Sequence, residues 1–264
     1  MSDANGLAVI TGASSGIGLE LARQFAEHGF DLIVAAEDDE LTAAAGSLDG
    51  ADVQVDAVRV DLATPAGVEQ LYERIQASNR PVDALALNAG IGSGGAFVET
   101  ELEDELKLVD LNVRSVVHLA KLVVRDMVAR GEGRVLITSS IASTMPGSFQ
   151  AVYNASKSFD QSFALALRNE LKDTGITVTS LMPGPTDTEF FERAEMLDTK
   201  VGSGDKDDPA DVARDGFEAL MAGDERVVSA SLSTKIQARA GRVLPDSVKA
   251  EMHRKMAEPG SAKD

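Results

Sequence analysis

Tyr153 and Lys157 lie four residues apart and have side chains that can work together in proton transfer. They begin an apolar stretch with helical periodicity, and their spacing places both side chains on one face of a helix. A phenol with its ordinary pKa of about 10 is a poor acid or base at neutral pH unless a nearby cation stabilises the phenolate. The pair therefore predicts a tyrosine that acts as a general acid or base, with a lysine as its activating cation.

Two further polar residues are candidates for the same chemistry. Ser140 follows a predicted strand, where its hydroxyl can orient a carbonyl oxygen, but with Thr138, Ser139 and Ser143 beside it the segment also fits an ordinary polar junction. Asn112 lies inside a predicted helix, where asparagine is unfavourable, so its side chain is a candidate for a functional role. The alternative is a polar residue on the protein surface. The three histidines lack the spacing of metal ligands, so no metal site is predicted.

A glycine-rich turn joins the first predicted strand to the first predicted helix. Its spacing is Gly-x3-Gly-x-Gly, which differs from the more familiar Gly-x-Gly-x-x-Gly but has the same physical basis. The backbone can approach a pyrophosphate there, and the helix N-terminus offers free N–H groups and a positive dipole. A turn that only packs the helix on the strand is the alternative. The predicted dinucleotide contacts are Gly12, Ser14, Ser15, Gly16, Ile17 and Gly18.

The residues after the third and fourth predicted strands are candidates for other parts of a dinucleotide. Asp61, followed by Leu62, can accept a hydrogen bond from an adenine amino group, or else cap the next helix. Asn88, Ala89 and Gly90 close the fourth strand, where small residues let the backbone lie against a ribose, although an ordinary turn has the same composition.

Glu37 lies just past the second predicted strand, about 20 residues after the glycine turn. A carboxylate in this place accepts hydrogen bonds from the adenosine ribose hydroxyls and repels a 2′-phosphate. We therefore expect NAD(H) to be preferred over NADP(H) as the cofactor. Alternatively, Glu37 and Asp38 merely begin the next helix, where acidic residues are favoured.

Apolar runs recur along the chain with helix-length segments between them. This alternation predicts a single-domain α/β fold, a doubly wound Rossmann-type parallel sheet with helices on both faces. We expect a dinucleotide-binding catalytic domain over residues 1–230 and a helical extension over 231–264. The extension has helix-like segments at 236–243 and 246–256, and its last few residues are expected to lack fixed structure. The predicted strands are residues 7–11, 31–36, 53–60, 83–87, 134–138, 177–181 and 226–230, and residues 200–209 are predicted to form a loop.

Composition limits the kind of partner. The chain has 264 residues, 44% of them hydrophobic, which suits a globular protein with a packed core. Its 43 acidic and 25 basic residues give a formal net charge of -18, a field that repels nucleic acids and anionic membranes. There is no cysteine, no signal-peptide pattern and no apolar run of membrane-spanning length. We therefore expect a cytoplasmic protein that binds neither nucleic acid nor membrane.

These motifs together resemble the short-chain dehydrogenase/reductase family over roughly residues 7–230. The family's glycine motif matches the turn described above, its Asn-Ala-Gly matches residues 88–90, and its Ser-x12-Tyr-x3-Lys matches Ser140, Tyr153 and Lys157. The family's turn after the sixth strand matches Pro183, Gly184, Thr186 and Thr188, and the resemblance implies that Thr188 holds the nicotinamide carboxamide.

The resemblance also implies a division of labour among the catalytic residues. Tyr153 would be the acid in reduction and the base in oxidation. Lys157 would lower the pKa of Tyr153, and both side chains would contact the cofactor, Lys157 at the nicotinamide ribose. Ser140 would hold the substrate oxygen, and Asn112, which matches the fourth catalytic residue, would place a water that links Lys157 to solvent.

The expected activity is that of an NAD(P)-dependent oxidoreductase that interconverts a secondary alcohol and its ketone or aldehyde. A non-catalytic dinucleotide-binding sensor or scaffold is the alternative from another class, and an epimerase or dehydratase is an alternative among enzymes. We expect a homodimer or homotetramer, the dimer being built on the helices that carry Asn112 and Tyr153. The segments around the site suggest a moderately large, apolar carbonyl or alcohol substrate; their apolar residues are Ile91, Phe97, Ile141, Met145, Phe149, Phe190, Phe191, Met196 and Leu197.

Overall fold

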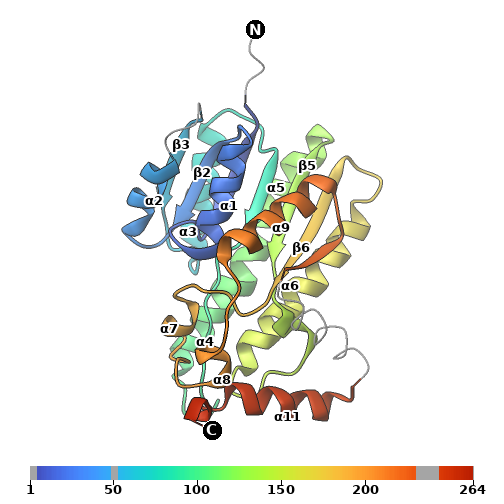
Figure 1. Cartoon of the computed structure of the whole chain (residues 1–264). Helices are drawn as coiled ribbons and strands as arrows, with labels where there is room; N and C mark the ends of the chain where they lie inside the picture. The colour runs from blue at the N-terminus through green and yellow to red at the C-terminus, as the bar shows by residue number, and fades with distance from the viewer. Residues whose placement is uncertain (1–4, 49–52, 230–243, 264) are drawn as a thin grey trace.

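The computed structural model describes residues 5–48, 53–229 and 244–263. Its centre is a seven-stranded parallel sheet with the order β3-β2-β1-β4-β5-β6-β7 (Figure 1). The predicted α/β doubly wound fold is confirmed, with each strand close to its expected place. The strands are β1 (Leu7–Thr11), β2 (Asp31–Ala36), β3 (Val55–Arg59), β4 (Ala84–Leu87), β5 (Gly133–Thr138), β6 (Ile176–Pro183) and β7 (Arg226–Ser229).

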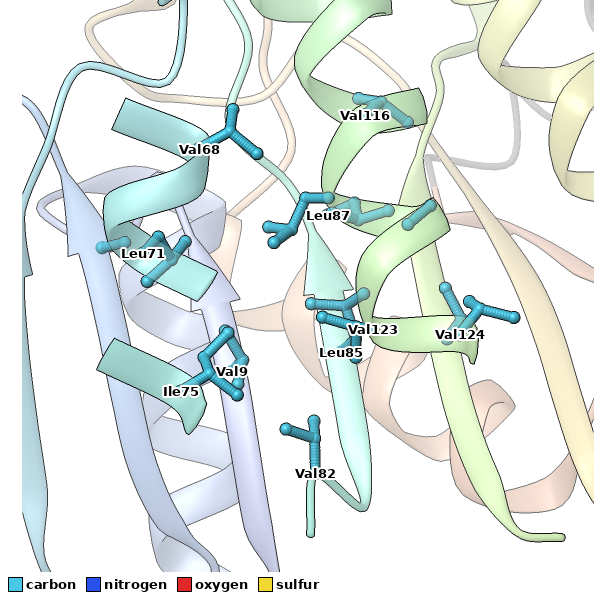
Figure 2. Packing of buried hydrophobic residues seen from close by; sticks show 14 of the residues in the cluster. Val9, Val68, Leu71, Ile75, Val82, Leu85, Leu87, Val116, Val123 and Val124 are labelled. Carbon is cyan, nitrogen blue, oxygen red and sulfur yellow. The ribbon is translucent and has the colours of Figure 1, made fainter. Parts of the chain in front are cut away.

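Helices cover both faces of the sheet, which explains why the central strands are apolar along their whole length rather than alternating. One face packs against α1, α2 and α9, the other against α3, α5 and α6 (Figure 1). Figure 2 shows the second layer, where Leu71 of α3 and Val123 of α5 meet Val9 and Leu85 of the sheet. The helices are α1 (Gly16–Glu27), α2 (Glu40–Leu48), α3 (Pro65–Ala77), α5 (Ser115–Arg130), α6 (Ala151–Glu170) and α9 (Pro209–Ala222).

The order of the strands determines where a ligand can bind. The chain winds outward from β1 to β3 in one direction and from β4 to β7 in the other, so the connections diverge between β1 and β4. At such a switch point the carboxyl ends of the strands open into a crevice. Helices outside the two layers gather at that edge (Figure 1): α4 (Leu102–Val109), α7 (Phe190–Arg193), α8 (Lys200–Ser203) and α11 (Asp246–Ala257). Two further short elements are the π-helix η1 (Asp110–Arg114) and the 3-10 helix η2 (Ile141–Thr144).

Two expectations for the last third of the chain were wrong. Lys200–Ser203 forms α8 inside the predicted loop, because the Thr199 hydroxyl accepts a hydrogen bond from the Gly202 N–H and starts a helical turn. Residues 261–263 also have a defined structure: Ser261–Lys263 forms a 3-10 turn, and the Ala262 N–H bonds to the Asp198 carbonyl. The predicted helix at 246–256 is confirmed as α11. The one at 236–243 lies outside the described residues.

Candidate active site

A cavity of about 800 Å³ lies at the carboxyl edge of the sheet. Three of the four catalytic candidates line it, namely Ser140, Tyr153 and Lys157, whereas Asn112 lies behind the wall. All the residues that the sequence suggested for the cofactor also line this cavity: Gly12, Ser14, Ser15, Gly16, Ile17, Gly18, Glu37, Asp61, Leu62, Asn88, Ala89, Gly90, Tyr153, Lys157, Pro183, Gly184, Thr186 and Thr188.

The glycine turn is shaped by close backbone contacts. Gly12 has a φ of +68°, and a Cβ on it would lie 2.8 Å from the Ala89 Cα. A Cβ on Gly18 would lie only 1.9 Å from the Gly12 carbonyl oxygen, so no other residue fits there without moving the backbone. Helix α1 begins after Ser15, whose side chain makes no capping hydrogen bond. The first N–H groups of α1 are therefore available to an anion in the cavity.

Asn88 braces this turn from the neighbouring strand. Its Nδ2 donates to the Thr11 carbonyl at 3.3 Å, and its Oδ1 accepts a hydrogen bond from the Thr138 hydroxyl at 3.1 Å. Its backbone N–H donates to the Thr11 hydroxyl at 3.0 Å. One side chain thus links the ends of β1, β4 and β5. Asn88 therefore has a structural role beyond the ordinary turn that was the alternative for residues 88–90.

Two carboxylates and one ammonium group lie near the end of β2. Glu37 lines the cavity, but its side chain is 47% exposed and pairs with Lys107 of α4 at 3.6 Å. Asp38 also lines the cavity, and its Oδ2 accepts a hydrogen bond from the Ser14 hydroxyl at 2.8 Å. Its Oδ1 is buried and has no hydrogen-bond partner among the described residues. Sequence reasoning selected Glu37 but missed both Asp38 as the better-placed acceptor and the nearby Lys107.

Asp61 lies on the cavity wall after β3, as expected. The alternative that it caps α3 is wrong, because the N-cap of that helix is Thr64, whose hydroxyl accepts the Gly67 N–H. Asp61 instead closes a local turn by accepting the Ala63 N–H through Oδ1 at 2.9 Å. Its carboxylate therefore stays at the edge of the cavity.

The segment after β6 closes over the glycine turn. Thr188 lies next to Gly16, where a Cβ would come within 2.8 Å of the Thr188 methyl group. The Thr188 hydroxyl accepts the Phe190 N–H at 3.3 Å, and the Thr186 hydroxyl donates to the Gly184 carbonyl at 2.9 Å. The segment that begins at Pro183 thus faces the start of α1 across the cavity.

Tyr153 and Lys157 lie on the first turns of α6 and face the cavity together. The Lys157 ammonium is buried and donates to the Thr138 carbonyl at 2.9 Å. It also donates to Oδ2 of Asp160 at 3.1 Å, a buried carboxylate one helical turn further on. Asp160 does not line the cavity and was not a sequence candidate. The activating lysine is therefore half of an ion pair that the sequence analysis missed.

The pKa of the Tyr153 phenol is raised above its ordinary value overall, although Lys157 lowers it as expected. Burial is the largest cause, because the phenolate loses its water. The Lys157 ammonium and a hydrogen bond with the Ser140 side chain act in the opposite direction but do not outweigh burial. The Asp160 carboxylate raises the pKa further, since it offsets part of the lysine charge.

Asn112 lies at the centre of η1, and π-helical turns of this kind often occur at functional sites. Its side chain is fully buried. The amide exchanges two hydrogen bonds with the backbone of Ile91, each 2.9 Å long, and donates to the Ser156 hydroxyl at 3.1 Å. The alternative of a surface asparagine is wrong. The side chain clamps the loop after β4 onto α6, beside the backbone of Gly90.

The suggested substrate contacts divide into three groups. Ile91, Ile141, Met145, Phe190 and Phe191 line the cavity. Phe97 and Leu197 are more than half exposed and do not line it. Phe149 and Met196 pack with Ala257 in a small apolar cluster instead. The cavity also includes residues that sequence reasoning missed, because they come from the loop before α6 and from the C-terminal segment: Gln150, His253, Met256 and Pro259.

Two kinds of feature are absent from the described ranges. Within residues 5–48, 53–229 and 244–263, no helix is both long and apolar enough to cross a bilayer. The same ranges hold no group of three or more histidine, aspartate or glutamate side chains arranged to bind a metal ion.

Comparison with known proteins identifies the family of this chain. Residues 6–197 match the family model described as short chain dehydrogenase. The chain belongs to the short-chain dehydrogenase/reductase family. The oxidoreductase UcpA of Salmonella typhimurium is 32% identical over 216 residues, which cover 81% of this chain and 79% of that protein. The 3-oxoacyl-(acyl-carrier-protein) reductase FabG of Escherichia coli is 32% identical over 196 residues, covering 74% and 79% of the two chains.

Solved structures of short-chain dehydrogenases have the same fold. A short-chain dehydrogenase from Sphingobium yanoikuyae in complex with NADPH superposes with a TM-score of 0.80 at 29% identity, over 89% of this chain and 92% of that one. A short-chain dehydrogenase/reductase from Burkholderia phymatum in complex with NAD gives a TM-score of 0.82 at 26% identity, over 90% and 94%. The protein is therefore an oxidoreductase of the short-chain dehydrogenase/reductase family with its Rossmann-type sheet.

Proposed function

We propose that this protein interconverts a secondary alcohol and its ketone or aldehyde, with a nicotinamide dinucleotide as the redox partner. The observation that carries the proposal is the meeting of Ser140, Tyr153 and Lys157 on one wall of the cavity, with the lysine ammonium buried beside the phenol. A proton donor, its stabilising cation and a hydroxyl that can orient an oxygen are the groups that carbonyl reduction needs.

The cavity fits a dinucleotide in two independent respects. The glycine turn has no room for a Cβ at Gly12 or Gly18, and it offers the free N–H groups of α1 to a pyrophosphate. At the end of β2, the buried and unpartnered Oδ1 of Asp38 is an acceptor suited to a ribose hydroxyl. When bound, the nicotinamide supplies or accepts the hydride, and relatives in complex with NADPH or NAD support this assignment.

The chain's own residues supply the proton chemistry. In reduction, Ser140 orients the carbonyl oxygen and the Tyr153 hydroxyl donates its proton to that oxygen. Lys157 stabilises the phenolate that remains, and its position is fixed by bonds to the Thr138 carbonyl and the Asp160 carboxylate. In oxidation Tyr153 takes the proton back as a base. Because burial raises its pKa, the phenol is held in the protonated form that reduction needs, and oxidation needs alkaline pH to form the phenolate.

Replacement of Tyr153 by phenylalanine tests this proposal. Tyr153→Phe removes the proton donor but leaves the glycine turn intact, so we expect unchanged cofactor affinity and a loss of turnover of about 10²–10⁴-fold. The measurements are cofactor titration and the change in nicotinamide absorbance with a panel of ketones and secondary alcohols. Turnover within a few-fold of the unaltered enzyme would overturn the role of Tyr153. Cofactor binding without any turnover of the panel by the unaltered protein would favour the sensor or scaffold.

The proposed cofactor preference is NAD(H) over NADP(H). Two carboxylates, Glu37 and Asp38, line the cavity at the end of β2, and both would repel a 2′-phosphate. The ammonium of Lys107 lies 3.6 Å from Glu37 and partly balances it. Since that pair is half exposed, solvent screens its attraction, and the second carboxylate is left uncompensated.

The proposed assembly is a homodimer built on α4, α5 and α6. These helices leave large apolar side chains in contact with solvent: Leu102, Leu106, Val109, Val117 and Phe159. The Phe159 ring stacks on the Phe163 ring with 5.8 Å between the ring centroids, so the exposed ring packs against a neighbouring side chain. A second copy of the same helices would cover these side chains, as a two-fold interface joins identical patches.

A further inference from the structure

The side chain of Gln150, directly before α6, is buried without a hydrogen-bond partner. The residue is only 6% exposed and lines the cavity three residues ahead of Tyr153. Its backbone N–H and carbonyl bond to Gly147 and Asn154. The amide Nε2, by contrast, has no partner among the described residues. A buried amide left in this state costs about 1–3 kcal/mol, so a ligand group that bonds to it would remove the penalty.

His253 of α11 reaches the same corner from the other end of the chain. Its Nδ1 lies 2.9 Å from the Ser148 carbonyl oxygen, and the ring lines the cavity. A carbonyl oxygen can only accept, so Nδ1 carries the proton and Nε2 of the neutral ring is an acceptor. Burial lowers the pKa of the imidazole, which keeps the ring neutral at physiological pH. Ser148 is two residues from Gln150, and the His253 ring and the Gln150 side chain line the same cavity.

The backbone around this corner is held in a fixed shape. The Ser148 hydroxyl donates to the Ala250 carbonyl of α11 at 3.1 Å, which joins the loop to the helix a second time. Phe149, between Ser148 and Gln150, has a φ of +65°, a conformation that is costly for an aromatic residue and needs support from its surroundings. The Arg254 guanidinium lies 5.2 Å from the Phe149 ring centroid and supplies part of that support.

Apolar side chains from neighbouring segments also line the cavity. They come from η2, the segments around α7 and α8, and the C-terminal segment: Met145, Phe190, Val201, Met256 and Pro259. An apolar wall with one donor and one acceptor binds a mostly apolar molecule and fixes its orientation through a single polar group.

We propose that Gln150 and His253 form a polar subsite for a hydroxyl group that the substrate carries away from its reacting carbonyl. A hydroxyl accepts a hydrogen bond from the Gln150 amide and donates its own proton to Nε2 of His253, so it satisfies both groups at once. A carboxylate does not, because it would face the lone pair of the neutral imidazole. The inference rests on the proposed function, since it names the substrate class of that site: an apolar carbonyl compound with a distal hydroxyl.

The test uses matched ketones that differ only in the hydroxyl: benzylacetone with its para-hydroxy derivative, and a ten-carbon methyl ketone with its ω-hydroxy derivative. Calorimetry measures their affinity for the full chain loaded with the reduced dinucleotide that it binds. The Tyr153→Phe background prevents turnover. We expect the hydroxylated member of at least one pair to bind about tenfold more tightly. Equal affinities within both pairs, or no binding by any of the four compounds, would overturn the subsite.

Two variants identify the groups responsible. Gln150→Leu removes the amide, and His253→Asn keeps a donor for the Ser148 carbonyl but removes the Nε2 acceptor. Each should abolish the preference for the hydroxylated ketone and leave affinity for the plain ketone within about twofold. Gln24→Leu, on the far helix α1, is the matched control and should retain the preference. A preference that survives both Gln150→Leu and His253→Asn would overturn the assignment.

The same compounds separate this inference from the proposed function. If the unaltered enzyme reduces both members of a pair with equal kcat/KM and binds them equally, the proposed function stands and the subsite is wrong. If it binds the hydroxylated ketone preferentially but reduces none, the subsite stands and the proposed function is wrong. The binding measurement therefore tests the subsite, and the turnover measurement tests the proposed function.

Discussion

The Asp160 carboxylate lies 3.1 Å from the Lys157 ammonium, and both groups are buried. The second carboxylate oxygen, Oδ1, has no partner within the described part of the chain. Burial raises the pKa of Asp160, while the lysine charge opposes that shift. The carboxylate also raises the pKa of Tyr153, because it offsets part of the positive charge that stabilises the phenolate. Asp160 thus acts on the proton donor through Lys157, as a positioning residue.

Asp160→Asn should therefore shift the pH dependence of alcohol oxidation. Asparagine keeps an oxygen acceptor for Lys157 but removes the negative charge, so the pKa of Tyr153 falls. Oxidation requires the phenolate, and its rate should reach the plateau about one pH unit lower than in the unaltered enzyme. The measurement is kcat/KM for an alcohol from neutral to alkaline pH, with cofactor affinity followed separately. Asp126→Asn, on α5, is the control. A pH profile identical to that of the unaltered enzyme would mean that Asp160 carries no charge.

The sequence predicted those parts of the site that depend on local pattern. The glycine turn, the strand ends and the four-residue spacing of Tyr153 and Lys157 are all short-range features, which hydrophobic periodicity and backbone stereochemistry determine. Asp160 is equally close in sequence, but an acidic residue at that spacing on a helix usually faces solvent. Only the packing of α6 against the sheet reveals that it is buried.

Other parts of the site depend on contacts between distant segments. His253 meets Ser148 from 105 residues away, and no periodicity in either segment indicates the contact. Lys107 approaches Glu37 from α4, so reading the residues around β2 alone did not reveal a cation. The sequence analysis selected Glu37 and did not consider Asp38 as the acceptor, because which of the two side chains is the more buried after β2 depends on contacts with the glycine turn, such as the bond between Ser14 and Asp38.

Gly18→Ala should damage the fold and the dinucleotide site together. The new Cβ would lie 1.9 Å from the Gly12 carbonyl oxygen, which forces α1 away from the turn. We expect a loss of about 1–3 kcal/mol in the free energy of unfolding and at least tenfold weaker cofactor binding. Urea denaturation and cofactor titration measure the two effects.

A glycine with space around it is the matched control. A Cβ on Gly46 in α2 would meet no atom within 4 Å, so Gly46→Ala should stabilise the protein by about 0.5–1 kcal/mol through helix propensity. Its cofactor affinity should not change. Cofactor binding by Gly18→Ala at the level of Gly46→Ala would contradict the steric account of the turn.

Phe159→Glu should weaken the proposed dimer. The ring is 38% exposed on α6, and a charge in the centre of an apolar interface is poorly solvated. We expect the mass in solution to fall from that of two subunits to that of one, or the dissociation constant to rise at least tenfold. Light scattering during gel filtration measures the mass. Val98→Glu changes an even more exposed apolar residue outside the helices and should leave the mass unchanged. A monomeric unaltered protein, or a dimer unaffected by Phe159→Glu, would count against this interface.

The last prediction concerns the cofactor. The unaltered enzyme should use NADH with a kcat/KM about tenfold or more above that for NADPH, because two carboxylates lie where a 2′-phosphate would come. Of the two, Asp38 should matter more for NADH, since its Oδ1 is buried and unpartnered while its Oδ2 is held by Ser14. Asp38→Asn should therefore weaken NADH binding more than Glu37→Gln does.

Lys107→Gln completes the set. Its ammonium lies 3.6 Å from Glu37 and lines the cavity, whereas the Arg59 guanidinium nearby is bonded to the Glu37 carbonyl and the Asp39 carboxylate. The loss of Lys107 should therefore weaken NADPH use and leave NADH nearly unchanged. Calorimetric affinities and kcat/KM for both reduced cofactors measure the effects in all three variants. Equal or better use of NADPH by the unaltered enzyme would contradict the proposed preference, and its loss in Lys107→Gln would then assign the NADPH use to Lys107.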